Sequence, residues 1–492
     1  MTQIVASIVE SSIAGVADSS RIAFREGADL VEIRLDHLDG LTVPMIKEAR
    51  DAAIGPAIAT LRSKAEGGKS GLGTAQRERI LRAAIEADFE YVDLDVKNDI
   101  RLLRKLRGTE MFTKIIASRH FSKPVSKAVI VRTLRDAWSV GELAKVAMPC
   151  ADASDALMLA QVGMGLKRQK KRFVIIGMGL QGQLTRAAAE NIGSAMVYAC
   201  LHGKEAAPGQ LDVPRQSGLA SGGRAILGLI GHPVSHSVSK PMQEATLREL
   251  NIPGIYLPLD FPGKTFDKKA MNALKEVGFK GLNVTIPHKG AAFKMCARKS
   301  ESALATKAVN TIKFDGPAAV GENTDVNGFA LLLDGKLCIT KYTTALVVGA
   351  GGAARAVAYV LSERMARITV TDIDNKRSRD LARTFHAHAV PLQKLWKSRE
   401  EFDLVVNCTP VGMKGNSGNP IRASCIKPGG VFVDIIFNPL VTEAMETAEK
   451  RGAKSYGGLE MLVQQGAESF RYWLGREPNV DSMREAARRA LQ

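Results

Sequence analysis

The chain has 492 residues, 45% of them hydrophobic and 24% charged, with a formal net charge of +17. This length is too great for one compact core, so we expect two or three domains. Aromatic residues are only 5% of the chain, which argues against stacking platforms for single-stranded nucleic acid. We interpret the densest basic cluster, KRQKKR at Lys167–Arg172, as a solvated loop rather than a nucleic-acid patch. Small anionic substrates and phosphate-bearing cofactors account for the basic balance.

The six cysteines form no CxxC pair and no zinc-ligand spacing, which favours free thiols in a reducing cytoplasm and no metal site. The first residues, MTQIVASIVE, lack the basic and apolar regions of a targeting peptide. No stretch approaches the roughly 18 uncharged apolar residues of a membrane span. We therefore expect a cytoplasmic protein that binds neither membranes nor nucleic acid.

The first part of the chain alternates short β-rich runs with longer helical segments. The runs are IVASIV, LVEIRL, AIATL, YVDLDV, KIIAS, ELAKVAM, RFVIIG and MVYAC. Such alternation predicts a parallel sheet, closed as a (β/α)8 barrel over residues 1–218. A Gly-, Pro- and Ser-rich break at residues 208–224 follows, and we place the domain boundary near Ser221.

In such a barrel, the active site lies at the carboxyl ends of the strands. The polar residues predicted there are Glu32, Arg34, Asp36, Arg62, Glu66, Asp93, His120, Lys145, Arg186 and Gln210. Lys145 lies among apolar neighbours, and a desolvated amine is a nucleophile for a ketone or aldehyde. The alternative is a lysine whose tip reaches out to water. His120 is a candidate proton carrier that Glu66 could orient, although a histidine after a strand can also be structural.

Three arginines, Arg34, Arg62 and Arg186, fall at the same mouth of the predicted barrel. Together they could hold a carboxylate and hydroxyl groups of a substrate. The alternative is an ion-pair network with the acidic residues at that mouth. Those acidic residues are Glu32, Asp36 and Glu66.

Six motifs then occur in order: EIRLD from Glu32, TLRSKAEGG from Thr60, ASRHF from Ala117, AKVAMP from Ala144, GMGLQGQLTR from Gly177 and APGQL from Ala207. This pattern resembles the type I 3-dehydroquinate dehydratase family over residues 1–215. The resemblance implies that Lys145 forms an imine with the C3 ketone of 3-dehydroquinate and that His120 removes the C2 proton and helps to expel the C1 hydroxyl. It also implies that Arg186 holds the substrate carboxylate. The ring hydroxyls would be held by Glu32, Arg34, Arg62 and Gln210. Ala206 stands where relatives commonly have a serine.

In the second half, GAGGAAR at Gly349–Arg355 follows a strand and opens a helix. Glycines at such a turn let the backbone approach a pyrophosphate at the helix N-terminus, so we predict a dinucleotide site. Asp372 closes the next strand about 20 residues on, as in that fingerprint. The residues predicted to bind the cofactor here are Gly349, Ala350, Gly351, Gly352, Ala353 and Asp372.

Upstream, NVTIPHKG puts Lys289 after a strand, and GENTD puts Asp325 before a helix. These two could carry the proton that accompanies hydride transfer. Ser237 and Ser239 are short donors suited to a carboxylate. The alternatives are a surface lysine, a helix N-cap aspartate and a serine-rich turn.

The segments GLIGHPVSHSVSK, GLNVTIPHKG, AVNTI, GENTD, GAGGAAR, NCTPVGM and GGLEMLVQQ resemble the shikimate dehydrogenase family over about 225–490. The resemblance implies a catalytic Lys289–Asp325 pair and hydride transfer to the C3 carbonyl of 3-dehydroshikimate. It implies substrate contacts from Ser237, Ser239, Asn283, Thr285, Asn310 and Gln465. It places Asn407, Thr409, Met413 and Gly458 on the cofactor side. The implied domains are residues 222–335 for substrate, 340–456 as a Rossmann NAD(P) domain and 457–492 as helices packing back on the substrate domain.

Two positions depart from this second family. Phe437 stands where relatives usually carry a tyrosine, and TDIDNKR at Thr371–Arg377 replaces the Asn-Arg-Thr of NADP-using relatives. The resemblance implies NADP(H), whereas a carboxylate at Asp372 favours the free ribose of NAD(H). Lys376 and Arg377 could restore NADP(H) binding if the loop folds back.

The leading hypothesis is a bifunctional enzyme that dehydrates 3-dehydroquinate and reduces the product to shikimate. The second is NAD-dependent oxidation of quinate or shikimate in a catabolic route. The third is a basic nucleic-acid-binding protein on an α/β scaffold, against which the few aromatics and the lack of a reader motif weigh. The oligomeric state is left open.

Overall fold

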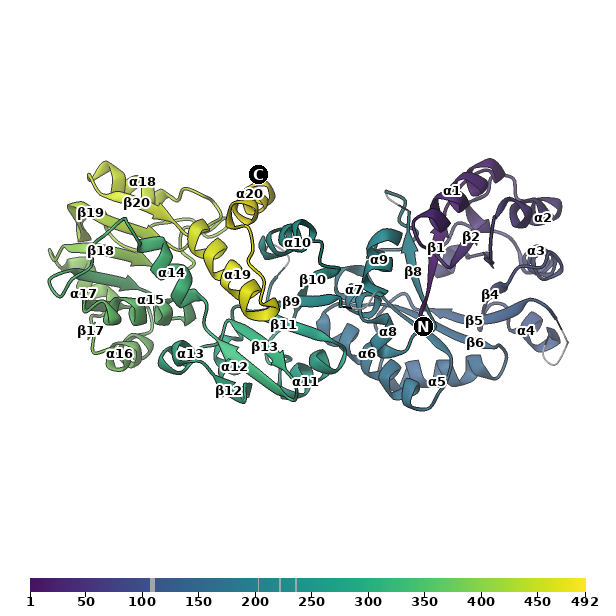
Figure 1. Cartoon of the computed structure of the whole chain (residues 1–492), viewed down its shortest axis with the longest axis horizontal. Helices are drawn as coiled ribbons and strands as arrows, with labels where there is room; N and C mark the ends of the chain where they lie inside the picture. The colour runs from purple at the N-terminus through teal and green to yellow at the C-terminus, as the bar shows by residue number, and fades with distance from the viewer. Residues whose placement is uncertain (107–110, 202, 221–222, 235–236) are drawn as a thin grey trace. The chain divides into compact units, whose positions relative to one another are not determined.

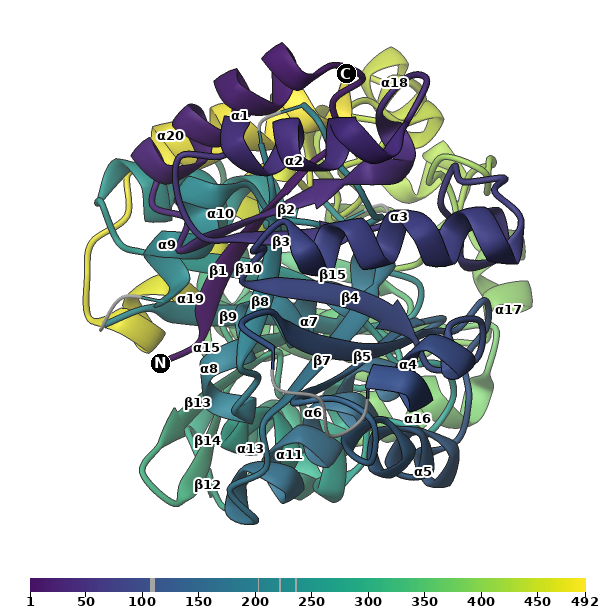
Figure 2. The same ribbon diagram turned by 90° about the vertical axis from the view of Figure 1, so that its right-hand side faces the viewer.

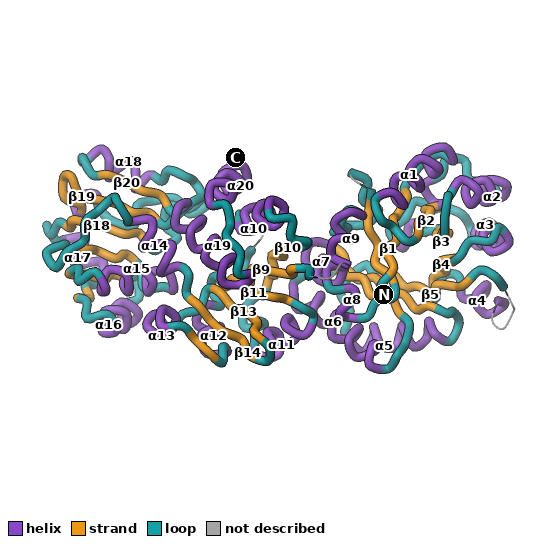
Figure 3. The backbone as a smooth tube through the Cα atoms, viewed as in Figure 1, coloured by secondary structure: helices purple, strands orange, loops and turns teal. Residues whose placement is uncertain are grey.

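The computed structural model describes residues 1–106, 111–201, 203–220, 223–234 and 237–492. The first part contains an eight-stranded sheet in the order β7-β6-β5-β4-β3-β2-β1-β8, in which every neighbouring pair of strands is parallel. The predicted barrel is thus confirmed as a near-closed one (Figures 1 and 3). Its strands are β1 Gln3–Ile8, β2 Leu30–Arg34, β3 Ala57–Thr60, β4 Tyr91–Asp95, β5 Lys114–His120, β6 Leu143–Pro149, β7 Phe173–Met178 and β8 Met196–Cys200.

Strands β7 and β8 stand at the two ends of this strand order. Isolated hydrogen bonds join them near their amino-terminal ends. The backbone N–H of Ala195 donates to the carbonyl of Phe173 at 2.7 Å, and the N–H of Ile175 donates to Oγ of Ser194 at 3.4 Å. Because strands of a barrel are staggered, contact at one end closes the sheet without a full ladder.

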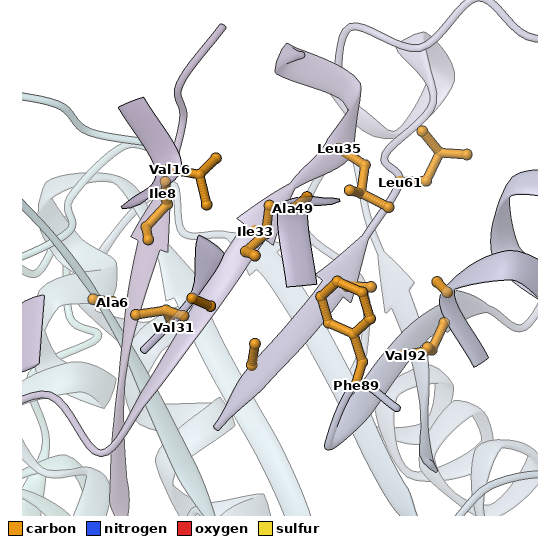
Figure 4. Close-up of a cluster of buried hydrophobic side chains, with 14 of the residues drawn as sticks. Ala6, Ile8, Val16, Val31, Ile33, Leu35, Ala49, Leu61, Phe89 and Val92 are labelled. Carbon is orange, nitrogen blue, oxygen red and sulfur yellow. The ribbon is translucent and has the colours of Figure 1, made fainter. Parts of the chain in front are cut away.

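Helices cover the outer side of the barrel strands (Figures 1 and 2). They are α1 Ile13–Arg25, α2 Val43–Ala52, α3 Thr74–Glu86, α4 Ile100–Leu106, α5 Lys127–Trp138, α6 Ala153–Arg168, α7 Gly179–Ala187, α8 Ala189–Ile192 and α9 Val213–Ala220, with the 3-10 turns η1 Leu35–His37 and η2 Lys64–Glu66. Figure 4 shows one cluster of buried side chains, in which Ile8 and Ile33 of the strands lie near Val16 and Ala49 of the helices. Since side chains on both faces of a parallel sheet are covered, its strands are short apolar runs.

The second part begins with a six-stranded sheet in the order β10-β9-β11-β13-β14-β12. Its strands are β9 Ala225–Gly231, β10 Gly254–Asp260, β11 Phe279–Val284, β12 Arg298–Lys299, β13 Thr311–Asp315 and β14 Ala318–Glu322. Strand β13 is antiparallel to both β11 and β14. The helices of this segment are α10 Ser239–Glu249, α11 Lys268–Glu276, α12 Lys289–Met295, α13 Glu301–Thr306 and α14 Asp325–Leu333.

A second six-stranded sheet, in the order β17-β16-β15-β18-β19-β20, is parallel throughout. Numbered from β15, this is the 3-2-1-4-5-6 order of a Rossmann domain. The strand order reverses between β15 and β18, which is the topological switch point of the sheet. The strands are β15 Thr344–Val348, β16 Arg367–Thr371, β17 His388–Ala389, β18 Phe402–Asn407, β19 Ile426–Asp434 and β20 Lys454–Gly457. The helices are α15 Gly352–Glu363, α16 Asn375–Thr384, α17 Leu392–Lys397 and α18 Glu443–Lys450, with the 3-10 turn η3 Ala423–Cys425.

Two helices end the chain, α19 Leu459–Leu474 and α20 Val480–Leu491. Buried side chains from both helices, among them Val463 and Met483, pack in one apolar cluster with Met242 of α10. The indole N–H of Trp473 donates to the carbonyl of Ile312 in β13 at 2.9 Å. The last helices therefore pack on elements that precede the Rossmann sheet in the sequence.

The chain divides into two compact units, Met1–Leu227 with Ile252–Phe279, and Gly228–Asn251 with Lys280–Gln492. The predicted boundary residue Ser221 lies outside the described residues. The predicted Gly-, Pro- and Ser-rich break at residues 208–224 is not irregular throughout, because residues 213–220 form helix α9. The carboxylate of Asp212 accepts the N–H of Arg215 at 2.8 Å, and a proline in the first helical turn costs no hydrogen bond.

The basic cluster Lys167–Arg172 is exposed, but Lys167 and Arg168 are the last residues of α6 rather than a loop. Nζ of Lys167 donates to the carbonyls of Glu190 and Asn191, both at 3.1 Å. Within the described residues, no helix combines the length and the apolar character that crossing a membrane requires.

Candidate active sites

A cavity of about 430 Å³ opens at the carboxyl ends of the barrel strands. All the barrel residues that the sequence predicted as catalytic or substrate-binding line it. They are Glu32, Arg34, Arg62, His120, Lys145, Arg186 and Gln210. This volume lies within the range of small-molecule sites.

Lys145 is the third residue of β6 and only 2% exposed. Its Nζ lies 2.9 Å from Oδ2 of Asp93 and 3.8 Å from Oε1 of Glu32. The alternative of a lysine that reaches out to water is therefore wrong, since the amine ends inside the barrel between two carboxylates.

Asp93 is a functional candidate to which the sequence assigned no role. Its Oδ1 accepts a hydrogen bond from Oγ of Ser118 at 2.5 Å and lies 3.0 Å from Nη2 of Arg62. Burial acts to raise the pKa of Asp93, but the charges of Arg62 and Lys145 outweigh it and hold this pKa well below its ordinary value. The only signal in the sequence was an aspartate in the middle of an apolar strand.

His120 is the last residue of β5 and is partly buried. Burial, together with the positive charges of Arg62 and Lys145, lowers its pKa well below 6.5. Glu66, which we expected to orient this imidazole, is bonded elsewhere. Its Oε1 accepts from Nη1 of Arg62 at 2.8 Å, and its Oε2 accepts from Oγ of Ser63 at 2.5 Å. Both carboxylate oxygens are thus already used.

The three arginines fall into two kinds. Arg34 makes a two-point ion pair with Asp36, at 2.8 Å for each bond, and Arg62 pairs with Glu66 and Asp93. For these two the ion-pair interpretation is right, although both also line the cavity.

Arg186 has no carboxylate partner among the described residues. Its Nη1 donates to the carbonyl of Tyr198 at 2.7 Å, whereas its buried Nε has no hydrogen-bond partner there. Burial lowers the pKa of Arg186 to about 10, so the side chain is still cationic near neutral pH. Arg186 lines the cavity, and a guanidinium there with no carboxylate partner among the described residues is suited to binding a substrate carboxylate.

Glu32 and Gln210 are joined through Ser7. Oγ of Ser7 donates to Oε2 of Glu32 at 2.8 Å and accepts from Nε2 of Gln210 at 3.2 Å. Oε1 of Gln210 accepts the N–H of Ala206 at 2.7 Å. An alanine at position 206, where relatives commonly have a serine, therefore still makes this backbone contact to Gln210.

In the second half, Nζ of Lys289 donates to Oδ2 of Asp325 at 2.5 Å. The lysine begins α12 and the aspartate begins α14. Their side chains are 16% and 9% exposed, so a surface lysine is excluded. The N-cap of α14 is Thr324, and the Asp325 carboxylate is not the cap that the alternative required.

Asn310 links this pair to other predicted residues. Its Nδ2 donates to Oδ1 of Asp325 at 2.8 Å and to Oε1 of Gln465 at 3.4 Å. Asn283 joins the same network, because its Nδ2 donates to Oγ of Ser469 at 2.9 Å and to Oγ1 of Thr311 at 3.2 Å. Thr311, Thr324 and Ser469 were missed, since their separate segments give no common pattern.

Ser237, Ser239 and Thr285 are not joined directly to this network. Oγ of Ser237 accepts the N–H of Ser239 at 3.2 Å, at the start of α10. The N–H of Thr285 donates to the carbonyl of Ile230 at 2.8 Å. Among the residues that the structure describes, no hydrogen bond connects these three to Lys289 or Asp325.

The glycine turn, residues 349–353, connects β15 to α15. A Cβ atom on Gly352 would lie 3.0 Å from Cδ of Lys289, so the turn lies directly against the lysine. Asp372 is bonded to this turn, because its Oδ2 accepts the N–H of Ala350 at 2.6 Å and its Oδ1 accepts the N–H of Asp374 at 2.8 Å.

The residues predicted on the nicotinamide side lie at the end of β18, in the loop after it, and directly after β20. Oδ1 of Asn407 accepts the N–H of Thr409 at 3.0 Å, and Nδ2 of Asn407 donates to Asp434 at 3.0 Å. A Cβ atom on Gly458 would come within 2.0 Å of the carbonyl oxygen of Ile435, so only glycine fits there. Met413 is 41% exposed and lines a second cavity, of about 590 Å³.

The fold and these geometries define two classes of protein in one chain. A buried lysine at the mouth of a (β/α)8 barrel is typical of an enzyme that acts on a carbonyl compound through an imine. A glycine turn at the switch point of a 3-2-1-4-5-6 sheet, next to a Lys–Asp pair, is typical of a dinucleotide-dependent oxidoreductase.

Family models match nearly the whole chain. Residues 4–215 match the type I 3-dehydroquinase model, and 229–312 match the substrate-binding domain of shikimate dehydrogenase. Residues 335–437 match the shikimate/quinate 5-dehydrogenase model, and 458–488 match the shikimate 5'-dehydrogenase C-terminal domain.

Three single proteins are also similar to the chain. The shikimate dehydrogenase (NADP(+)) of Archaeoglobus fulgidus is 40% identical over 54% of this chain and 98% of its own. The structure of quinate dehydrogenase from Corynebacterium glutamicum in complex with NAD is 31% identical, with a TM-score of 0.50, over 54% of this chain and 98% of its own. A dehydroquinate dehydratase and shikimate dehydrogenase structure from S. pombe is 24% identical, with a TM-score of 0.43, over 99% of this chain and 98% of its own. The chain belongs to the shikimate dehydrogenase family and joins to it a type I 3-dehydroquinase domain.

Proposed function

We propose that this chain catalyses two consecutive reactions, the dehydration of 3-dehydroquinate in the barrel and the reduction of the resulting 3-dehydroshikimate to shikimate in the second half. The observation that carries the first reaction is that the buried amine of Lys145 lines one cavity with the guanidinium of Arg186, which has no carboxylate partner among the described residues. A ketone with a carboxylate on the same ring meets both groups.

In the barrel, Nζ of Lys145 adds to the C3 carbonyl carbon of the substrate, and the carbonyl oxygen leaves as water. The cationic imine then draws electrons from the adjacent carbon, so that His120 can remove the C2 proton. The same imidazole returns a proton to the C1 hydroxyl, which leaves as a second water. One water then hydrolyses the imine, which releases the product and restores the amine of Lys145. The low pKa of His120 keeps the imidazole neutral, as a base must be.

In the second half, the groups present fit a dinucleotide, because the turn amides lie at the N-terminus of α15 and no side chain projects from Gly351 or Gly352. A bound nicotinamide supplies the hydride. Lys289 donates a proton to the oxygen of the C3 carbonyl, and Asp325 holds the lysine in place. Asn310, which also donates to Gln465, holds Asp325 from its other side.

Two arginines beside the glycine turn favour NADP(H), whereas the carboxylate of Asp372 is already bonded to the backbone. This carboxylate accepts two backbone N–H groups. Nη2 of Arg377 lies 3.7 Å from where a Cβ atom of Gly351 would be, so this arginine reaches back to the turn. Burial and the charge of Arg377 act to lower the pKa of Arg355, whose buried Nη1 has no partner among the described residues. Two guanidiniums beside the turn are suited to the ribose 2′-phosphate.

The alternative function is NAD-dependent oxidation of quinate or shikimate. A solved quinate dehydrogenase with NAD resembles the second half, and Asp372 is the residue that favours it here. Steady-state rates with shikimate or quinate, each with NAD or NADP, separate the two functions. None of the six cysteines forms a disulfide, which suits a reducing compartment such as the cytoplasm.

Borohydride reduction in the presence of 3-dehydroquinate tests the first reaction. We expect a covalent adduct on Lys145, located by mass spectrometry, and no adduct in Lys145→Ala. Full dehydratase activity in Lys145→Ala would overturn the proposal. A comparison of NADH with NADPH, with Asp372→Asn alongside, tests the cofactor.

A further inference from the structure

The aromatic ring of Tyr198 lies against the amine of Lys145. Nζ of the lysine is 3.8 Å from the ring centroid. The other cation–ring pairs among the described residues are 5.0–6.0 Å apart. Tyr198 is the third residue of β8, is 3% exposed and lines the same cavity as Lys145.

The surroundings of Nζ divide into a charged side and an aromatic side. Asp93 and Glu32 provide the carboxylates, at 2.9 and 3.8 Å, and Tyr198 provides the ring. An ammonium group can donate three hydrogen bonds, whereas a protonated imine has one N–H. Formation of the imine therefore removes donors that the carboxylates use, while the ring face still attracts the planar cation.

The hydroxyl group of Tyr198 is not what holds the side chain in place. It is buried and has no hydrogen-bond partner among the described residues. Burial, with Glu32 and Asp93 next in effect, raises the pKa of Tyr198 well above its ordinary value, so the phenol is neutral. The part of Tyr198 that the geometry uses is its ring.

We propose that Tyr198 is a positioning residue of the dehydratase, whose ring face holds the nitrogen of Lys145 and stabilises the cationic imine. This inference rests on the proposed imine chemistry. The step it assists is balanced, because an ammonium group and a ketone give a protonated imine and one water. The carbon–oxygen double bond is replaced by a carbon–nitrogen double bond, and the positive charge stays on nitrogen beside the ring.

Three substitutions separate the ring from the hydroxyl and from packing. Tyr198→Phe keeps the ring, Tyr198→Leu removes it, and Tyr91→Leu is the matched control. Tyr91 is a second buried tyrosine in the same interior cluster, and its ring faces Lys114 rather than Lys145, at 5.5 Å. We expect Tyr198→Leu to lower dehydratase kcat about 10- to 30-fold with a smaller change in KM. Tyr198→Phe restores most of this loss, and Tyr91→Leu shows no such loss.

A graded series guards against variants that fail to fold. Phenylalanine with one, two or three ring fluorines at position 198 keeps its shape while the negative face of the ring weakens. We expect log kcat, and the fraction of chains trapped by borohydride at saturating 3-dehydroquinate, to fall steadily with each fluorine. A flat series overturns the inference, as does equal activity of Tyr198→Leu and Tyr198→Phe, or an equal loss in Tyr91→Leu. If the unmodified chain shows no adduct, the proposed imine function fails instead.

Discussion

The carboxylate of Asp93 lies 2.9 Å from the amine of Lys145, and both side chains are almost fully buried. Arg62 approaches the same carboxylate from the other side, at 3.0 Å. One carboxylate therefore contacts two buried cations. This arrangement makes Asp93 important for stability as well as for the site, because an unpaired buried charge is costly.

We predict that Asp93→Ala destabilises the barrel by about 3–5 kcal/mol, since it leaves Lys145 and Arg62 without their shared partner. Hydrogen–deuterium exchange of peptides covering β4–β6 measures this change in the intact chain. The control is Asp18→Ala, which breaks an ion pair with Arg21 whose side chains are 63% and 71% exposed, and which we expect to have no measurable effect. Unchanged exchange in Asp93→Ala would contradict the prediction.

The pH dependence of the dehydratase follows from His120. Its pKa lies well below 6.5 because of burial and the nearby Arg62 and Lys145. The base is therefore neutral at pH 6.5 and is protonated only as the pH falls further. We predict that the acidic limb of kcat/KM for 3-dehydroquinate lies below pH 6.5. An acidic limb at or above pH 6.5 would show that His120 is not the base or is not buried as described.

Substitutions in the Lys289–Asp325 pair are predicted to lower the reductase activity and to leave the dehydratase activity unchanged. Lys289→Met and Asp325→Asn should each lower the reductase kcat about 10²- to 10⁴-fold, as expected for loss of proton transfer. The double variant should be little worse than either single variant, because the two residues act as a unit. Dehydratase activity of the same preparations is the internal control. Additive losses would argue for separate roles.

Arg377 is predicted to select the cofactor. Arg377→Ala should raise the KM for NADPH about 10- to 100-fold, because it removes one or two charge-assisted hydrogen bonds to the 2′-phosphate. The KM for NADH should change little, because NADH lacks this phosphate. Arg379→Ala, an exposed arginine on the same helix, is the control. Equal losses with both coenzymes would mean that Arg377 shapes the turn instead of binding the 2′-phosphate.

Gly458 is predicted to be intolerant of any side chain. Gly458→Ala would bring Cβ within 2.0 Å of the carbonyl oxygen of Ile435, so that the backbone between β20 and α19 must move, at a cost of about 1–3 kcal/mol. Thermal unfolding measures this as a lower Tm. Gly165→Ala, in α6 with nothing within 4 Å of its Cβ position, should instead keep or raise the Tm. A Tm unchanged by Gly458→Ala would show that this segment yields easily.

The sequence predicted the barrel and the Rossmann sheet well, because strands buried on both faces are short apolar runs that chain order assigns to a topology. It also predicted which polar residues meet at the barrel mouth, because the carboxyl ends of all eight strands point the same way. The glycine turn and Asp372 could be located by the same reasoning.

The pairing of those polar residues could not be predicted. Whether Glu66 contacts His120 or Arg62 depends on strand tilt and stagger, which no local pattern specifies. The partnership of Asp93 with Lys145 likewise joins strands β4 and β6, which are not neighbours. Helix α9 was missed because its glycine and proline content suggested a linker. Val213, Gln216 and Leu219 nevertheless form one buried face at helical spacing.

The approach of Gly352 to Lys289 has a consequence for attempts to change the coenzyme. The turn that receives the nucleotide and the side chain proposed to donate the proton share a wall, with 3.0 Å between the Cβ position of one and Cδ of the other. A residue larger than glycine at position 352 would press on the lysine side chain that donates to Asp325. Redesign of coenzyme preference at this turn would thus alter the reduction step itself, whereas changes confined to Arg377 and its helix would leave the proton donor in place.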